Sequence, residues 1–155
     1  MSKLQAGDAA PHFKLADGEG RVWDLAELKG QKVILYFYPV DDTPGCTVEA
    51  CDFRDSQADL REAGFVVLGV SPQDSDSHNR FSQKYSLNFP LLVDEDREVA
   101  AAYGAADDKG GLFKGIALRV KRATFIIDEN GVLEQALYGV KARGHVDQLK
   151  ESLLG

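Results

Sequence analysis

The chain has 155 residues, of which 44% are hydrophobic and 28% charged, a composition typical of a globular protein with a full core. Its 18 basic and 25 acidic side chains give a formal net charge of −7, which argues against nucleic acid or an anionic membrane surface as a partner. No segment is apolar over a membrane-spanning length, and the N-terminus has no apolar signal-peptide core. We therefore expect a single domain over residues 1–155 in the cytoplasm, where a cysteine pair is more often catalytic or metal-binding than structural.

Extended and helical segments alternate along the chain. The first feature is a β-hairpin, whose arms at 12–16 and 21–25 flank a glycine-containing loop, followed by a short helical turn that ends near Leu28. Further strands are predicted at 32–38, 65–70, 89–93, 123–127 and 132–138. Helices are predicted at 47–60, 75–86, 97–103 and 143–153, with a glycine-rich loop at 107–115. This order predicts an α/β, thioredoxin-like fold: a central mixed sheet flanked by helices, extended by the N-terminal hairpin.

The only two cysteines of the chain, Cys46 and Cys51, follow directly after the strand predicted at 32–38. Pro39 ends that strand because it has no N–H to donate to a neighbouring strand. Pro44 and Gly45 then form a turn, which places Cys46 in the first turn of the next helix. Unpaired N–H groups and the helix dipole favour negative charge there, so this position suits an activated thiolate nucleophile.

The spacing of the two cysteines restricts how they can react with each other. Five residues along a helix separate the Cα atoms by about 8–9 Å, whereas a disulfide requires a separation below about 7 Å. The thiols can therefore bond only if the first turns of the helix unwind. The spacing also differs from the Cys-x-x-Cys of thiol reductases, in which no such rearrangement is needed.

Peroxide reduction is a reaction that would use both thiols, because a thiolate oxidised to sulfenic acid can be resolved by a second thiol. Thr43 can direct a hydroxyl into the cysteine turn, Pro39 can shield the turn from water, and the N–H groups of Gly45 and Cys46 can donate to the peroxide. The cation that the reaction also needs must come from elsewhere. Arg122, immediately before the strand at 123–127, is the candidate if that strand lies beside the cysteine strand.

The stretch from Phe37 to Asp55, with Pro39, Thr43 and Cys46 in the pattern Pro-x-x-x-Thr-x-x-Cys, resembles the peroxiredoxins, and within them the Q subfamily, also called bacterioferritin comigratory protein. Arg122 before Thr124-Phe-Ile-Ile-Asp128 is similar to the family arginine. The resemblance implies that Cys46 is the peroxidatic and Cys51 the resolving cysteine of an intramolecular disulfide. It further implies reduction of hydrogen peroxide and small organic hydroperoxides in antioxidant defence, with thioredoxin as the electron donor and no cofactor or metal.

Other interpretations of these residues remain open at this point. Cys46 and Cys51 could be buried hydrophobes, Arg122 a solvated strand end, and Thr43 only a turn former. Glu49 could hold Arg122 or complement the helix dipole. The whole chain could instead be a thiol–disulfide oxidoreductase, or a binding protein that uses unwinding between the cysteines as a redox switch. Because a local disulfide needs no second subunit, we expect a monomer.

Overall fold

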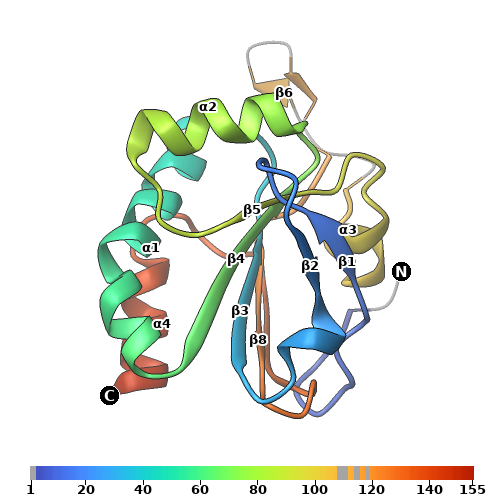
Figure 1. Ribbon diagram of the computed structural model, residues 1–155, viewed down its shortest axis with the longest axis vertical. Coiled ribbons are helices and arrows are strands. Elements are labelled where there is room, and N and C mark those ends of the chain that lie inside the picture. Colours follow the sequence, from blue (N-terminus) through green and yellow to red (C-terminus); the bar gives the residue numbers. More distant parts are fainter. Residues whose placement is uncertain (1–2, 108–111, 114–115, 118) are drawn as a thin grey trace.

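The computed structural model describes residues 3–107, 112–113, 116–117 and 119–155. Its centre is a five-stranded sheet in the order β5-β4-β3-β8-β9 (Figure 1). The strands are β3 (Lys32–Phe37), β4 (Phe65–Ser71), β5 (Leu91–Val93), β8 (Ala123–Ile127) and β9 (Leu133–Tyr138). β3, β4 and β5 run parallel, whereas β8 is antiparallel to both β3 and β9. The predicted mixed sheet is thereby confirmed.

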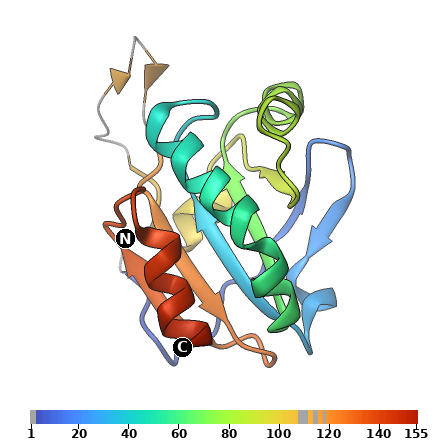
Figure 2. The same cartoon turned by 90° about the vertical axis from the view of Figure 1, so that its left-hand side faces the viewer.

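Helices and the N-terminal hairpin cover the two faces of this sheet. The helices are α1 (Pro44–Glu62), α2 (Ser75–Tyr85), α3 (Glu98–Ala102) and α4 (His145–Leu154). Figure 2 shows α1 and α4 side by side over one face. The other face carries α3 and the antiparallel hairpin of β1 (Lys14–Ala16) and β2 (Val22–Asp24), followed by the 3-10 helix η1 (Leu25–Leu28) (Figure 1). The predicted hairpin extension and flanking helices are confirmed.

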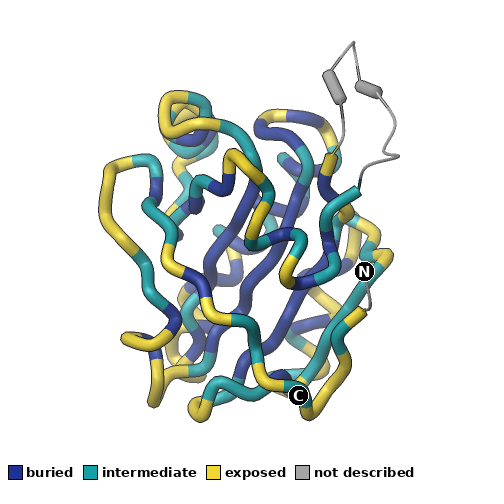
Figure 3. Tube along the Cα trace, turned by 90° about the vertical axis from the view of Figure 1, so that its right-hand side faces the viewer, coloured by how far each residue is buried: buried dark blue, intermediate teal, exposed yellow. Residues whose placement is uncertain are grey.

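The side chains of β3 alternate between two apolar cores, as expected for a central strand with both faces buried. Val33, Leu35 and Phe37 pack on the side of the hairpin and α3. Ile34 and Tyr36 pack on the opposite side, in the cluster that contains Cys46. Figure 3 shows that buried positions follow the strands through the interior while exposed positions gather in the connecting loops. The cysteine turn is thus attached to a central strand that is buried on both faces.

Two predicted segments differ from the structure. The helix predicted at 47–60 begins three residues earlier, at Pro44, because proline is well accommodated in the first helical position, where its missing N–H has no partner to lose. Much of the glycine-rich loop predicted at 107–115 lies outside the described residues. Within it, β6 (Leu112–Phe113) is a short strand that pairs antiparallel with β7 (Ile116–Ala117) just beyond it, so the prediction of a loop was wrong at 112–113. Within the described ranges, no helix has both the length and the apolar character needed to cross a lipid bilayer.

Candidate active site

Cys46 lies at the N-terminus of α1, at the end of the turn that leaves β3. Thr43 is the N-cap residue with extended backbone, and the first intrahelical hydrogen bond runs from the N–H of Thr47 to the carbonyl of Thr43 at 2.8 Å. The N–H groups of Gly45 and Cys46 precede that bond and are therefore among the donors that a helix leaves without intrahelical partners. Thr43 makes no capping bond with its side chain; its Oγ1 donates to the Val40 carbonyl at 2.9 Å. The hydroxyl oxygen of Thr43 keeps its lone pairs, so it can still accept a hydrogen bond from a ligand.

Arg122 reaches the sulfur of Cys46 from the neighbouring strand. Its Nη2 donates to Cys46 Sγ at 3.3 Å, and its Nη1 donates to Glu49 Oε1 at 2.7 Å. Glu49, fully buried one helical turn after Cys46, therefore holds the guanidinium in place. One fork thus binds a carboxylate and a thiol at once, which a lysine ammonium cannot do with the same geometry.

Burial shapes the charges of this pair. Burial raises the pKa of Glu49 to about 7, although Arg122 acts in the opposite direction. Burial acts to lower the pKa of Arg122, but Glu49 and Cys46 raise it above its ordinary value, so the guanidinium stays charged. The second carboxyl oxygen of Glu49, Oε2, is buried and has no hydrogen-bond partner among the described residues. A permanent positive charge therefore faces the sulfur, next to a carboxyl that takes up a proton readily.

The strand register and a glycine together allow this approach. Ala123 pairs with Phe37 in the ladder between β8 and β3, so Arg122 comes level with the end of β3, where the cysteine turn begins. A Cβ added to Gly45 would lie 3.2 Å from Arg122 Nη2, which is tighter than ordinary van der Waals contact. Gly45 therefore provides the space through which Arg122 reaches Cys46.

His145 lies behind Arg122, at the first residue of α4. Its Nε2 is 2.8 Å from the hydroxyl of Thr124, the second residue of β8. Its ring packs edge-on against Phe53. Burial and the charge of Arg122 lower the pKa of His145 to about 4, so the ring is neutral at neutral pH. His145 therefore adds no second positive charge near Arg122, and the guanidinium donates to Glu49 and Cys46.

Cys51 differs from Cys46 although both lie on α1. Both thiols are free, but Cys46 is only 1% exposed whereas Cys51 is half-buried. Burial raises the pKa of the Cys51 thiol, Asp55 and Asp52 raise it further, and Arg54 acts in the opposite direction. At neutral pH Cys51 is therefore a protonated thiol with solvent access.

The structure brings together most of the residues singled out in the sequence. Thr43, Cys46 and Arg122 meet at one end of the sheet, and the half-buried Pro39 opens the turn that carries the first two. Cys51 lies further along α1. Glu49, which the sequence left between two roles, holds Arg122. His145 was not singled out as a site residue, because only its tertiary contacts with Thr124 and Phe53 reveal its place and no local pattern signals it.

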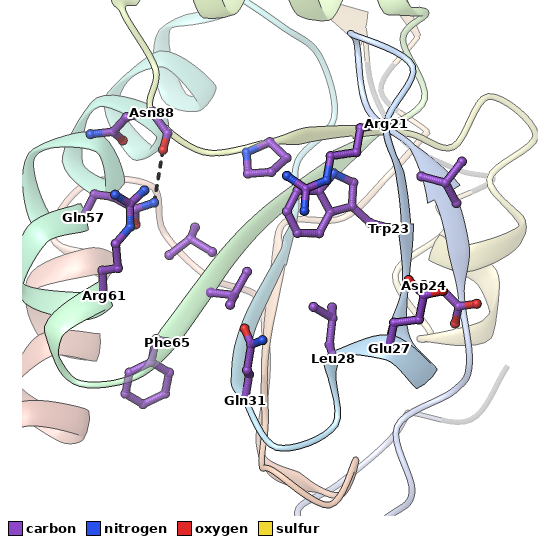
Figure 4. A pocket seen from close by; sticks show the side chains of 14 residues that line it. Arg21, Trp23, Asp24, Glu27, Leu28, Gln31, Gln57, Arg61, Phe65 and Asn88 are labelled. Atoms are coloured by element: carbon purple, nitrogen blue, oxygen red, sulfur yellow. Dashed lines mark hydrogen bonds between the residues drawn. The ribbon is translucent and has the colours of Figure 1, made fainter.

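Two cavities lie away from this site. One of about 370 Å³ lies between the hairpin and the C-terminal half of α1, with Arg21 and Trp23 facing Gln57 and Arg61 across it (Figure 4). A second, of about 270 Å³, adjoins it along the hairpin. Neither lining includes Cys46. In the described ranges, no three His, Cys, Asp or Glu side chains are grouped as ligands of a metal ion would be.

Comparison with known proteins relates this geometry to a family. Residues 6–136 match the sequence model of the AhpC/TSA family. A bcp protein of Coxiella burnetii, named as a peroxiredoxin, is 49% identical over 149 residues, which cover 94% of this chain and 96% of that protein. The crystal structure of peroxidoxin BcpB from Mycobacterium tuberculosis superposes with a TM-score of 0.85 at 32% identity and covers 97% of both chains.

A further structure, of the Xanthomonas campestris bacterioferritin comigratory protein, superposes with a TM-score of 0.82 at 34% identity and covers 92% of this chain and 90% of that one; its description concerns alkyl peroxide reduction. The similarity extends over nearly the whole chain in both sequence and structure. The matched residues include the cysteine turn, the first turn of α1, and Arg122 with the strand β8 that follows it. The chain therefore belongs to the AhpC/TSA family, among the peroxiredoxins named Bcp or Q.

Proposed function

We propose that the protein is a thiol-dependent peroxidase that reduces hydrogen peroxide and small organic hydroperoxides, with Cys46 as the attacking thiolate. Cys46 sulfur attacks one peroxide oxygen, the O–O bond breaks, and Cys46 becomes a sulfenic acid while the departing oxygen takes up a proton to leave as water or an alcohol. The observation that carries this proposal is the contact of Arg122 with Cys46 Sγ at 3.3 Å, at a helix N-terminus.

The residues around the sulfur have complementary roles in this step. Arg122 stabilises the thiolate and the charge that develops on the departing oxygen. The N–H groups of Gly45 and Cys46 and the hydroxyl of Thr43 align the peroxide, and Pro39 limits the access of water to the turn. Reduction of alkyl peroxides by the related Xanthomonas protein supports organic hydroperoxides as substrates.

Cys51 completes the cycle as the resolving thiol. Its sulfur attacks the sulfenic acid of Cys46, water leaves, and an intramolecular disulfide forms. Both cysteines belong to one continuous helix, from Pro44 to Glu62, in the reduced protein. Residues five apart on a helix have Cα atoms about 8–9 Å apart, beyond the reach of a disulfide, so the first turns of α1 must unwind before the bond can form.

A dithiol donor must then return two electrons to the disulfide, and thioredoxin is the donor that we propose. The cycle needs a compartment that supplies reduced thioredoxin, which favours the cytoplasm. Because both thiols belong to one chain, a single-domain monomer is sufficient. Sedimentation of the reduced protein should give a concentration-independent mass near 16.9 kDa, and a stable dimer would contradict this.

The first experiment adds one equivalent of hydrogen peroxide to the fully reduced protein and follows free thiols and intact mass against time. Rapid loss of both thiols, with a mass decrease of about two hydrogens, is the result that the proposal requires. Thiols that persist for hours would exclude Cys46 as an activated nucleophile and end the proposal. Reduction of the product by thioredoxin, compared with glutaredoxin, then identifies the electron donor.

A further inference from the structure

Asp41, five residues before Cys46, is a buried carboxylate that the peroxidase chemistry does not use. Its Oδ1 accepts from the Tyr38 hydroxyl at 2.6 Å, and its Oδ2 accepts from the Ser77 hydroxyl at 2.8 Å. Oδ2 also lies 2.6 Å from Nδ1 of His78. Both side chains of this last pair are almost completely buried, at 4% and 1% exposed. Burying a carboxylate in this way is costly unless both of its oxygens are hydrogen-bonded. In Asp41 both oxygens have partners.

His78 is held in place through both of its ring nitrogens. It lies in the first half of α2, and its Nε2 is 2.8 Å from the carbonyl oxygen of Leu92 on β5. Because a carbonyl only accepts, Nε2 carries a hydrogen that it donates to Leu92. The other ring nitrogen, Nδ1, makes the hydrogen bond with Asp41 Oδ2. The ring therefore joins α2, β5 and the cysteine turn at one point.

The backbone of the same turn is held by Gln73. Its Oε1 accepts from the N–H of Asp41 at 2.8 Å, and its Nε2 donates to the carbonyl of Pro39 at 3.3 Å. The hydroxyl of Ser71, at the end of β4, donates to the same Oε1 at 2.8 Å. One amide side chain thus fixes the turn on both sides of Val40, whose carbonyl in turn accepts from the Thr43 hydroxyl.

The adjacent Asp42 makes a different kind of contact. It adopts a positive φ of 60° and binds Lys84 Nζ and the Tyr85 hydroxyl, both at 2.7 Å, at the surface of the molecule. Solvent screens an exposed ion pair of this kind, so it holds the turn only weakly. The firm attachment of the turn to α2 is therefore through Asp41, not Asp42.

We propose that His78 and Gln73, acting through Asp41, are positioning residues for the peroxide reaction: they hold the turn that carries Pro39 and Thr43 in register with Cys46. Cys46 is fixed independently, by α1 and by the fork of Arg122. Loss of the Asp41 attachment should therefore misplace the Thr43 hydroxyl while leaving the charge environment of the sulfur unchanged. This inference rests on the proposed peroxidase function.

The test compares His78→Leu, His78→Asn and Gln73→Ala, all in a Cys51→Ser background in which Cys46 is the only thiol. Leucine keeps the packing of the ring but removes the Nδ1 contact with Asp41, whereas asparagine places an N–H donor near the same position. Asn79→Ala is the matched control, because Asn79 also lies on α2 and donates a single bond, at 2.7 Å, to the carbonyl of Gly18 in the hairpin rather than to the turn. The measurements are the second-order rate of Cys46 oxidation by hydrogen peroxide and the pH dependence of thiolate absorbance.

We expect His78→Leu and Gln73→Ala to slow oxidation by about tenfold or more, because small misplacements of reacting groups have effects of this size. Thiolate formation should follow the same pH dependence as in the parent, His78→Asn should recover most of the rate, and Asn79→Ala should react at the parent rate. Unchanged rates in folded variants, or a loss explained by altered thiolate formation, would overturn the inference. If His78→Leu does not fold by circular dichroism, Gln73→Ala decides. A parent protein that does not react with peroxide would instead refute the proposed function.

Discussion

The two cysteines of α1 occupy opposite electrostatic surroundings although only four residues separate them. Cys46 is buried against a charged guanidinium at the positive end of the helix. Cys51 is half-buried beside Asp52 and Asp55, which together with burial raise the pKa of its thiol. The proposed chemistry would use this difference, because the proposed nucleophile, Cys46, attacks peroxide as a thiolate, whereas the proposed resolving thiol, Cys51, acts only after the helix has opened. Substitutions at and around the two thiols test this difference.

The largest effect is expected from Cys46→Ser. Serine lacks the nucleophilic sulfur, so peroxide consumption should fall to the uncatalysed rate. Peroxide remaining in solution, measured with a dye assay, is the readout. Appreciable consumption by Cys46→Ser that depends on Cys51 would show that the roles of the two thiols have been exchanged.

Cys51→Ser should stop the cycle without preventing the first step. The variant should consume about one equivalent of peroxide and then accumulate sulfenic acid, which further peroxide converts to sulfinic acid. Intact-mass spectrometry distinguishes these products by the added oxygens. Sustained turnover of Cys51→Ser with thioredoxin would rule out Cys51 as the required resolving thiol.

Arg122→Lys tests whether the fork, rather than charge alone, activates Cys46. A single ammonium cannot donate to Glu49 and Cys46 with the geometry observed, so we expect the rate of Cys46 oxidation to fall by about 100-fold, equivalent to about 3 kcal/mol. Stopped-flow oxidation is the measurement. Lys121→Arg, one residue earlier in the chain, is the matched control. A decrease of less than about threefold would mean that positive charge is sufficient.

His145 makes the stability of the folded protein depend on pH in the acid range. Its pKa is about 4 in the folded protein, below the ordinary value of 6.5, so the unfolded chain binds a proton that the folded chain does not. Stability from this group is therefore complete above about pH 6.5 and is lost as the pH falls toward about 4, in total about 3 kcal/mol. Between these pH values, the change in the free energy of unfolding measured with urea should be less favourable by about 3 kcal/mol in the wild type and in His12→Asn, whose histidine is exposed, than in His145→Asn, because the other titrating groups, Glu49 among them, are common to all three proteins. Equal losses in all three proteins would contradict the assignment.

The smallest effect concerns Cys51. Replacing Asp52 and Asp55 by asparagine removes two groups that raise the pKa of this thiol. The thiolate should then form at lower pH, and disulfide formation after oxidation should accelerate a few-fold near neutral pH, with little change once the pH exceeds the pKa of this thiol. The rate of disulfide formation against pH is the measurement. A rate independent of both substitutions at every pH would mean that unwinding of α1, rather than the ionisation of Cys51, limits this step.

Local patterns in the sequence were sufficient for most of the fold and for Cys46 itself. The run from Lys32 to Tyr38 identified the central strand, and Pro44 and Gly45 identified a helix start within three residues. The neighbourhood of β3 and β8 was also predicted, and with it the position of Arg122.

What the sequence could not provide are contacts between residues far apart in the chain. The bond between Glu49 and Arg122 joins residues 73 apart, and that between Asp41 and His78 joins residues 37 apart. Both depend on strand register and helix rotation, which no local pattern determines. His145 is a further example, because a histidine that begins a helix looks the same in sequence whether it is solvated or packed against Phe53.

The apolar surroundings of Cys46 have a thermodynamic consequence for the catalytic cycle. In the reduced protein the sulfur is enclosed with Ile34, Tyr36, Ala50 and Phe53. Oxidation of Cys46 would add a hydroxyl to this sulfur, and a polar group enclosed by these apolar side chains raises the free energy of the closed helix. The open form can solvate the same group, so formation of a sulfenic acid on Cys46 should shift the equilibrium toward unwinding. Amide hydrogens in the first turns of α1 should therefore exchange faster in the sulfenic acid form than in the thiol form.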